Sequence, residues 1–150
     1  MFPRLPLAAL AAAALIACSD STGPSSALTL SHLAGTWDMT RLEMLLASDN
    51  TVRQDLKALL GLNASLTINN DGGATLSIQS PGEPTQTVSA TISIHGDTMV
   101  YDRANGSTYK ATVKLAGRSM TWLAVETDYW DLDGDGEPEE VRERDVWQRR

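Results

Sequence analysis

The chain has little of what cross-links a small domain or performs catalysis. Its 150 residues contain a single cysteine, Cys18, so no disulfide can form within one molecule. Only two histidines are present, His32 and His95, and neither stands beside a pattern for a nucleophile or a set of metal ligands. The sequence also lacks a glycine-rich phosphate loop followed by lysine. We therefore expect a protein that is not an enzyme.

Basic side chains are also scarce. Lysine and arginine total 12 against 19 aspartates and glutamates, which gives a formal net charge of -7 at pH 7. Binding to nucleic acid requires lysine and arginine to neutralise phosphates, and adhesion to anionic lipid headgroups requires the same charges. The composition therefore argues against nucleic acid as a partner and against electrostatic attachment to a membrane.

No apolar run is long enough for a transmembrane helix, which needs about 20 residues. The longest run covers residues 5–17, is interrupted by Pro6 and follows the basic residue Arg4. An apolar run of this length behind a basic residue is typical of a secretory signal peptide. We therefore expect this segment to direct export.

The run ends in Leu15-Ile16-Ala17-Cys18, and this ending resembles the lipobox of bacterial lipoproteins. The resemblance implies cleavage before Cys18 and acylation of its thiol and of the new amino terminus. The alternatives are an ordinary signal peptide with an incidental cysteine and a poorly formed membrane anchor. The lipoprotein interpretation predicts a signal peptide over residues 1–17, a flexible tether over residues 18–27 and a folded domain over residues 28–150.

Acylation of Cys18 would make a membrane a partner of the chain through its lipid anchor. Each buried methylene group contributes about 0.8 kcal/mol, so two or three acyl chains hold a protein firmly in a bilayer. The expected location is the bacterial cell envelope, at the outer membrane or at the periplasmic face of the inner membrane.

Apolar and polar residues alternate with period two through most of the folded part, which is typical of strands with one buried face. We expect eight strands, at residues 36–46, 64–69, 74–79, 86–95, 98–102, 108–115, 120–130 and 141–148. One segment, residues 49–60, instead has apolar residues at helical spacing and ends before Gly61. It predicts one short helix between the first and second strands.

Eight strands joined by tight turns predict an all-β fold, an up-and-down antiparallel barrel, since closure removes the exposed sheet edges. An eight-stranded sandwich or a partly open barrel with a filled core is the alternative.

The entry to the first strand, Gly35-Thr36-Trp37, resembles the Gly-x-Trp signature of lipocalins and of bacterial lipocalin-like lipoproteins. The resemblance implies that Trp37 closes one end of the barrel beneath an arginine from near the chain's end. The candidates for that arginine are Arg142, Arg144 and Arg149.

The lipocalin-like interpretation predicts a barrel that holds a small apolar or amphipathic ligand. Residues that would face such a cavity are Met99, Tyr101, Tyr109, Val113, Trp122 and Trp130. Small barrels also fill their interior with side chains of these types. In that case the chain would be a structural or interaction protein of the envelope, for example a barrel-type protease inhibitor.

An acidic loop lies between the last two expected strands, at residues 131–139. Carboxylates that alternate through a tight turn can converge on Ca²⁺, which takes six to eight oxygen ligands at about 2.3–2.6 Å. The spacing resembles the Asp-x-Asp-Gly-Asp-Gly calcium loops of bacterial repeat proteins, and the alternatives are Mg²⁺ or no metal. The expected ligands of a structural Ca²⁺ ion are Asp131, Asp133, Asp135, Glu137 and Glu139.

Overall fold

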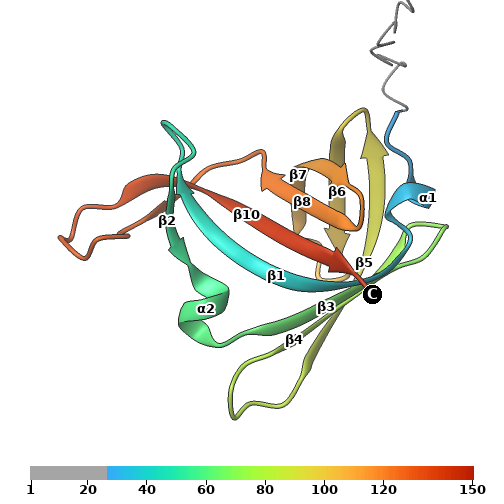
Figure 1. Cartoon of the computed structure of the whole chain (residues 1–150), viewed down its shortest axis with the longest axis horizontal. Coiled ribbons are helices and arrows are strands. Elements are labelled where there is room, and N and C mark those ends of the chain that lie inside the picture. The colour runs from blue at the N-terminus through green and yellow to red at the C-terminus, as the bar shows by residue number, and fades with distance from the viewer. Residues whose placement is uncertain (1–26) are drawn as a thin grey trace, which may run out of the picture.

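Eight antiparallel strands close into a barrel in the computed structural model, which describes residues 27–150 (Figure 1). The expected signal peptide, Cys18 and residues 18–26 of the expected tether lie outside the described residues. The barrel strands are β1 (Gly35–Leu46), β3 (Asn63–Ile68), β4 (Gly73–Gln79), β5 (Gln86–His95), β6 (Thr98–Arg103), β7 (Thr108–Ala116), β8 (Ser119–Ala124) and β10 (Glu139–Arg149). Each pairs with the next in this order, and β10 pairs with β1. The predicted all-β up-and-down barrel is confirmed.

Closure depends on the long pairing between the first and last barrel strands. The register runs from Trp37 opposite Arg149 to Leu46 opposite Val141, and it shifts at a bulge beside Thr40. The Thr40 hydroxyl donates a hydrogen bond to the Val146 carbonyl at 3.0 Å, across the same two strands. Figure 1 shows β1 and β10 curving side by side along the length of the barrel.

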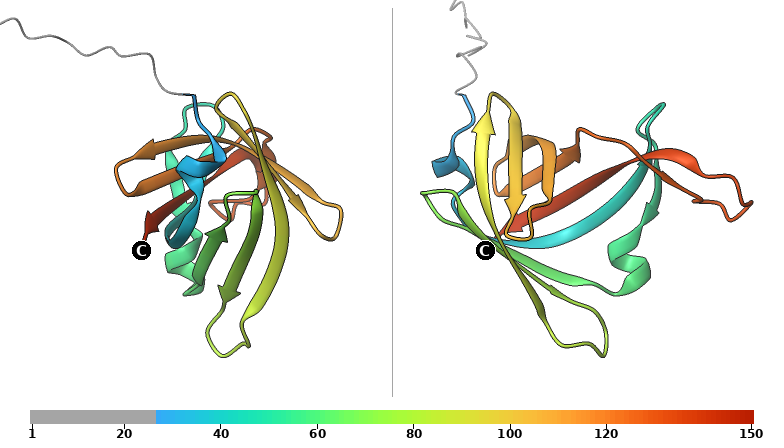
Figure 2. Two further views of the ribbon diagram at one scale, coloured as in Figure 1. Left: turned by 90° about the vertical axis from the view of Figure 1, so that its right-hand side faces the viewer. Right: turned by 180° about the vertical axis from the view of Figure 1, so that it is seen from behind.

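The barrel has two different ends (Figure 2). The closed end carries α1 (Leu30–Leu33), the β3–β4 turn at residues 69–72 and the chain's C-terminus. The opposite end, here called the mouth, carries α2 (Leu56–Leu60) and the acidic loop at residues 131–138. The sequence pattern did not predict α1, which lies across the closed end and inserts the fully buried Leu33 into the core.

The helix near the mouth is shorter than predicted. Residues 52–55 form the strand β2 (Val52–Asp55), which pairs with β1, and only residues 56–60 are helical. The Asp55 side chain accepts a hydrogen bond from the Ala58 backbone N–H, which fixes the helix start there instead of at residue 49. Gly61 ends the helix in the left-handed conformation, as expected.

The predicted strand at residues 120–130 is divided in two. It forms β8 and β9 (Asp128–Trp130), with a break at residues 125–127, and both pieces pair with β10. In the same way β3 and β2 both pair with β1. The β1–β10 pair therefore continues beyond the barrel wall at the mouth, with β2 on one side and β9 on the other.

The apolar core is also divided between the two ends. The larger cluster includes Trp37, Met120 and Trp147 and fills the closed part of the barrel. A smaller cluster at the mouth consists of Met44, Leu56 and Val141. The closed part is thus packed with side chains, and any binding site in the barrel has to lie towards the mouth.

Candidate functional site

A pocket of about 420 Å³ opens at the mouth, where β8 ends and leaves a gap between β7 and β10. Leu56 from α2 and Val141 from β10 give it apolar walls. Trp130 from β9, which is 46% exposed, forms part of its rim. Tyr109 and Glu143 are the polar groups that reach it from the inward faces of β7 and β10. We call this cavity the mouth pocket.

A second carboxylate lies deeper in the barrel behind Glu143. Strand β10 alternates, so Asp145 shares the inward face with Glu143 and with the buried residues Val141 and Trp147. Asp145 is only 4% exposed, and its Oδ1 atom has no hydrogen-bond partner among the described residues. A charged group without a partner in such a place is strongly disfavoured.

The pKa values show that these groups influence one another. Burial raises the pKa of the Asp145 carboxyl well above its usual range, and the nearby Glu143 carboxylate raises it further. Burial likewise raises the pKa of Glu143, against the opposing effects of the Tyr109 hydroxyl and the Arg103 guanidinium. The pKa of Tyr109 is raised by burial and then by the charges of Asp145 and Glu143.

Four of the six residues expected to bind a ligand lie away from this pocket. Met99, Tyr101 and Trp122 are in the packed core, and Val113 belongs both to that core and to a different pocket. Tyr109 and Trp130 do line the mouth pocket. Sequence reasoning missed Glu143 and Asp145, although two acids alternating between apolar positions 141 and 147 of a strand were a visible signal.

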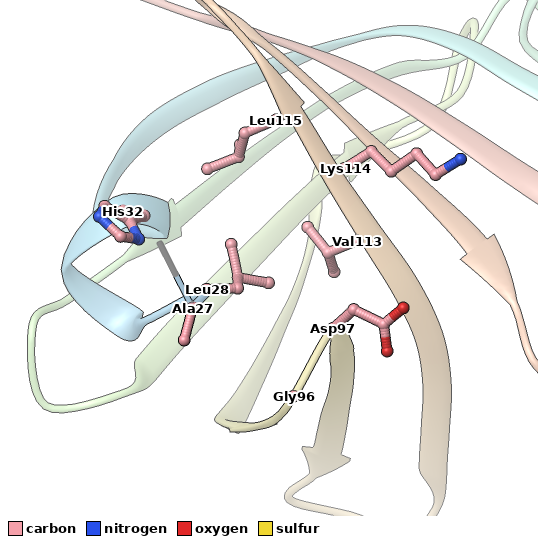
Figure 3. Close-up of a pocket in the computed structure, with 8 residues that line it drawn as sticks. All are labelled: Ala27, Leu28, His32, Gly96, Asp97, Val113, Lys114 and Leu115. Atoms are coloured by element: carbon pink, nitrogen blue, oxygen red, sulfur yellow. The ribbon is translucent and has the colours of Figure 1, made fainter. Parts of the chain in front are cut away.

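The pocket that contains Val113 lies at the closed end and measures about 660 Å³ (Figure 3). Leu28 and Leu115 add apolar surface to it, and the charged residues on its border, Asp97 and Lys114, are exposed. It contains no buried carboxylate or hydroxyl group that could fix the orientation of a ligand. The mouth pocket, with polar groups converging at its floor, is the better candidate site.

The closed end is held by contacts around Trp37. The Trp37 indole N–H donates a hydrogen bond to the Leu33 carbonyl at 2.8 Å. Of the three arginines considered from the sequence, Arg149 lies over the Trp37 ring, with its guanidinium carbon 4.5 Å from the ring centroid. The same guanidinium donates a hydrogen bond to the His32 carbonyl at 2.6 Å. Gly35 begins the strand with a φ of 133°, which an L-residue rarely adopts.

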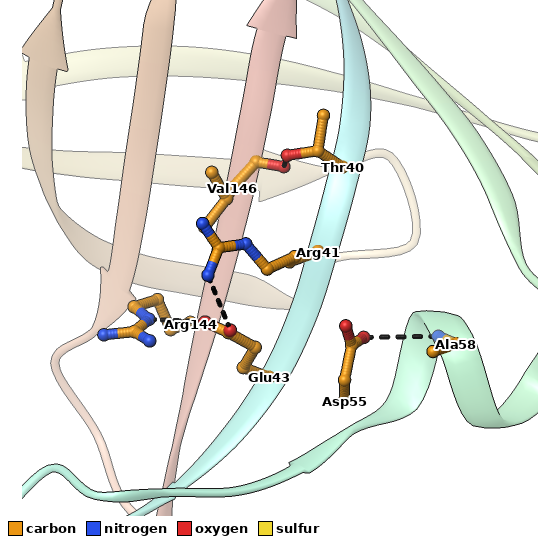
Figure 4. A network of polar contacts seen from close by, with 7 residues as sticks. All are labelled: Thr40, Arg41, Glu43, Asp55, Ala58, Arg144 and Val146. Atoms are coloured by element: carbon orange, nitrogen blue, oxygen red, sulfur yellow. Dashed lines mark hydrogen bonds and ion pairs between the residues drawn. The ribbon is translucent and has the colours of Figure 1, made fainter.

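A buried ion-pair network joins β1 and β10 on the outer face of the barrel (Figure 4). Glu43 is 3% exposed and accepts hydrogen bonds from Arg144 at 2.6 Å and from Arg41 at 3.2 Å. Both carboxylate oxygens are therefore paired, in contrast to Asp145. The network stabilises barrel closure and does not reach the mouth pocket.

The acidic loop brings three of the five expected metal ligands together. Carboxylate oxygens of Asp131, Asp133 and Asp135 all lie within 4.8 Å of one another. Oxygens on opposite sides of a Ca²⁺ ion are separated by about twice the 2.3–2.6 Å bond length, so one ion fits between them. Glu137 is outside this group, and Glu139 accepts a hydrogen bond from the Leu132 backbone N–H at 2.8 Å.

Comparison of the sequence with protein-family models and with curated proteins found no match. Within residues 27–150, neither helix has the length and apolar character needed to cross a bilayer.

Proposed function

We propose that the chain is an exported, lipid-anchored binding protein of the bacterial cell envelope, with a lipocalin-like barrel that holds a small apolar or amphipathic molecule. The observation that carries the proposal is the mouth pocket. Its volume of about 420 Å³ lies in the range of about 300–1,000 Å³ that is typical of ligand sites. Apolar walls with a few convergent polar groups are also typical of such sites.

The mouth also provides apolar surface for the approach of such a ligand. Leu59 and Leu60 on α2 are 63% and 51% exposed, and Tyr129 and Trp130 on β9 are 67% and 46% exposed. These side chains belong to the two elements that border the mouth pocket. They also support the second candidate function, a protein of the envelope that binds a partner through this rim and uses no internal ligand.

A substitution that fills the mouth pocket distinguishes ligand binding in the pocket from partner binding at the rim. Ala124 is nearly buried and lines the mouth pocket, so Ala124→Leu places three more carbon atoms in the cavity. We expect the neutral fluorescent probe Nile red to bind the wild-type chain and to bind Ala124→Leu at least tenfold more weakly. Ala116→Leu, an exposed position on β7 at the closed end, is the matched control and should bind as the wild type does. Equal probe binding by all three chains would refute the pocket, provided that their melting curves agree.

Lipid anchoring is tested at Cys18. Cells that express the chain and are fed radiolabelled palmitate should label the wild-type protein, and Cys18→Ala should abolish the label. Labelling that persists without the cysteine would contradict the lipoprotein interpretation.

We also propose that the acidic loop binds Ca²⁺ through Asp131, Asp133 and Asp135. The ion would neutralise three carboxylates that otherwise repel one another and would stabilise the hairpin between β9 and β10. Millimolar Ca²⁺ should raise the melting temperature of the wild type, and Asp133→Asn should reduce that rise. A melting temperature that does not change between calcium and a chelator would argue against the site.

A further inference from the structure

We propose that the inner part of the mouth pocket binds the ammonium group of a small organic amine, held between the carboxylates of Glu143 and Asp145. This inference rests on the proposed ligand-binding function and specifies the chemical class of the ligand. An amine with an apolar body would place its charge at the floor of the pocket and its carbon skeleton against the walls.

The first support is the absence of a counter-charge beside Asp145. Its two neighbours across the paired strands are Leu42 on β1 and Trp122 on β8, and neither is basic. Glu143, two residues earlier on the same inward face, lies opposite Met44. The strands that flank these two carboxylates therefore bring no lysine or arginine opposite them.

The second support is a set of unpaired polar atoms in the same part of the barrel. The Tyr101 hydroxyl, the indole N–H of Trp122 and Oδ1 of Asp145 are all buried and have no hydrogen-bond partner among the described residues. Native proteins leave few buried polar groups unpaired, and such groups commonly mark the position of an absent water, ion or ligand. Here the unpaired groups include the Asp145 carboxylate oxygen and the Tyr101 hydroxyl, both of which can accept a hydrogen bond from an ammonium N–H.

Aromatic rings complete the environment of a cation. Trp122 lies opposite Asp145 in the β8–β10 register, and it packs against Tyr101 with ring centroids 6.2 Å apart. The faces of such rings attract cations, and a bound ammonium would add this attraction to its hydrogen bonds. The guanidinium of Arg103 makes such a cation–π contact with the Tyr101 ring, with its carbon 5.9 Å from the ring centroid.

The charges at the pocket rim favour the same class of ligand. Glu126 and Asp128 line the mouth pocket, and Lys110 is the one basic residue that does so. Together with Glu143 they make the lining net negative. Arg103, which is exposed on β6, is a further cation that acts on Glu143. A ligand that carries a positive charge is therefore drawn towards the pocket, and an anion is repelled.

The test compares ligands that share the phenethyl body and differ in the charge of the attached group. The full chain is studied by calorimetry in phosphatidylcholine vesicles, with protein-free vesicles as the blank. The probes are phenethylamine, its uncharged N-acetyl derivative and the anion 3-phenylpropanoate. We expect the amine to bind at least tenfold more tightly than the neutral derivative and the anion to bind most weakly.

Two variants test whether Glu143 and Asp145 bind the ammonium group. Glu143→Gln and Asp145→Asn keep the size of each side chain and should each weaken amine binding about tenfold, with little change for the neutral fluorescent probe Nile red. Glu83→Gln in the exposed β4–β5 loop and Asp97→Asn at the closed end make the same chemical changes and should have no effect. If Asp145→Asn does not fold, Glu143→Gln together with the three-ligand series still decides the question.

The pH dependence supplies a second measurement on the unmodified protein. The amine requires ionised carboxylates, so its affinity should fall as the pH is lowered and Glu143 and Asp145 take up protons. Tyr109 and Arg103 act directly on Glu143, and Lys110, Glu126 and Asp128 line the same pocket. Burial raises the pKa of the Tyr109 hydroxyl, so this group stays neutral over the range in which the carboxylates take up protons.

Two results would overturn the inference and leave the binding function intact: equal affinity for the amine and its neutral derivative, or amine binding that neither carboxylate variant weakens. Failure of both Nile red and the amine to bind would overturn the binding function as well.

Discussion

Replacement of the Asp145 carboxyl by a neutral amide should stabilise the folded chain at a pH high enough to ionise that carboxyl. The carboxyl group is 4% exposed, it lies between Leu42 and Trp122 in the sheet, and its Oδ1 atom has no partner. Replacing a buried ion pair by well-packed apolar residues of similar volume is often neutral or stabilises a protein by about 1–4 kcal/mol, because burying charge is costly. An asparagine keeps a polar group at the same place, so we expect Asp145→Asn to raise the free energy of unfolding by about 2 kcal/mol at pH 8.

The effect should depend on pH in a defined direction. Because burial raises the pKa of Asp145 in the folded state, the folded chain binds the proton more tightly than the unfolded chain. The stabilising contribution of that proton is complete below the ordinary aspartate pKa of about 4, and it is lost as the pH rises through the folded-state pKa. Glu143 follows the same direction, since burial also raises its pKa. The wild type should therefore lose stability as the pH rises above about 4, and Asp145→Asn should lose less.

Urea unfolding followed by tryptophan fluorescence at pH 4, 6 and 8 measures this difference. A gain of about 2 kcal/mol corresponds to roughly 5–10 °C in melting temperature for a domain of this size. Asp97→Asn, at an exposed turn, is the control and should change stability little at any pH. If Asp145→Asn destabilised the chain equally at pH 4 and pH 8, the substitution would remove no pH-dependent cost of a buried charge, and the reasoning would be wrong.

Two further substitutions test the closed end. Arg149→Ala removes the cation from the Trp37 ring and the hydrogen bond to the His32 carbonyl, and it should lower the free energy of unfolding by about 2 kcal/mol in urea titrations. Gly72→Ala should cost more than about 2 kcal/mol, because Gly72 has a φ of 90° and a Cβ there would collide with the Ile92 carbonyl oxygen. Gly106→Ala, with a φ of 86° and open space around it, should cost only about 1 kcal/mol. Equal losses at the two glycines would show that the collision contributes nothing.

The sequence was sufficient to predict the barrel because its local signals agree with one another. Alternating residues along β5 and β7 put Ile92 and Val113 inside, and glycines with positive φ, such as Gly96 and Gly106, stand at the turns between strands. These signals depend only on residues that are neighbours in the chain. They could therefore be recognised in the sequence, and the structure has the strands and turns that they predict.

The errors lie at the mouth, where distant contacts decide the local structure. Val52 has the spacing of a helical residue, yet pairing with Leu45 on β1 makes it part of a strand. The predicted strand continues through residues 125–127, yet these residues break it, and the chain pairs with β10 again as β9. The same long-range arrangement brings Glu143 to Tyr109, which the spacing of neither residue could indicate.

The positions of the two ends of the barrel have a consequence for how the protein would work on a cell. The described chain starts beside α1, and the mouth pocket lies at the other end of the barrel. If Cys18 carries the lipid, residues 18–26 reach at most about 30 Å, so the membrane stays near α1. The mouth pocket would then open towards the aqueous compartment. If the pocket holds a ligand, that ligand would then be exchanged with the aqueous compartment and not with the bilayer.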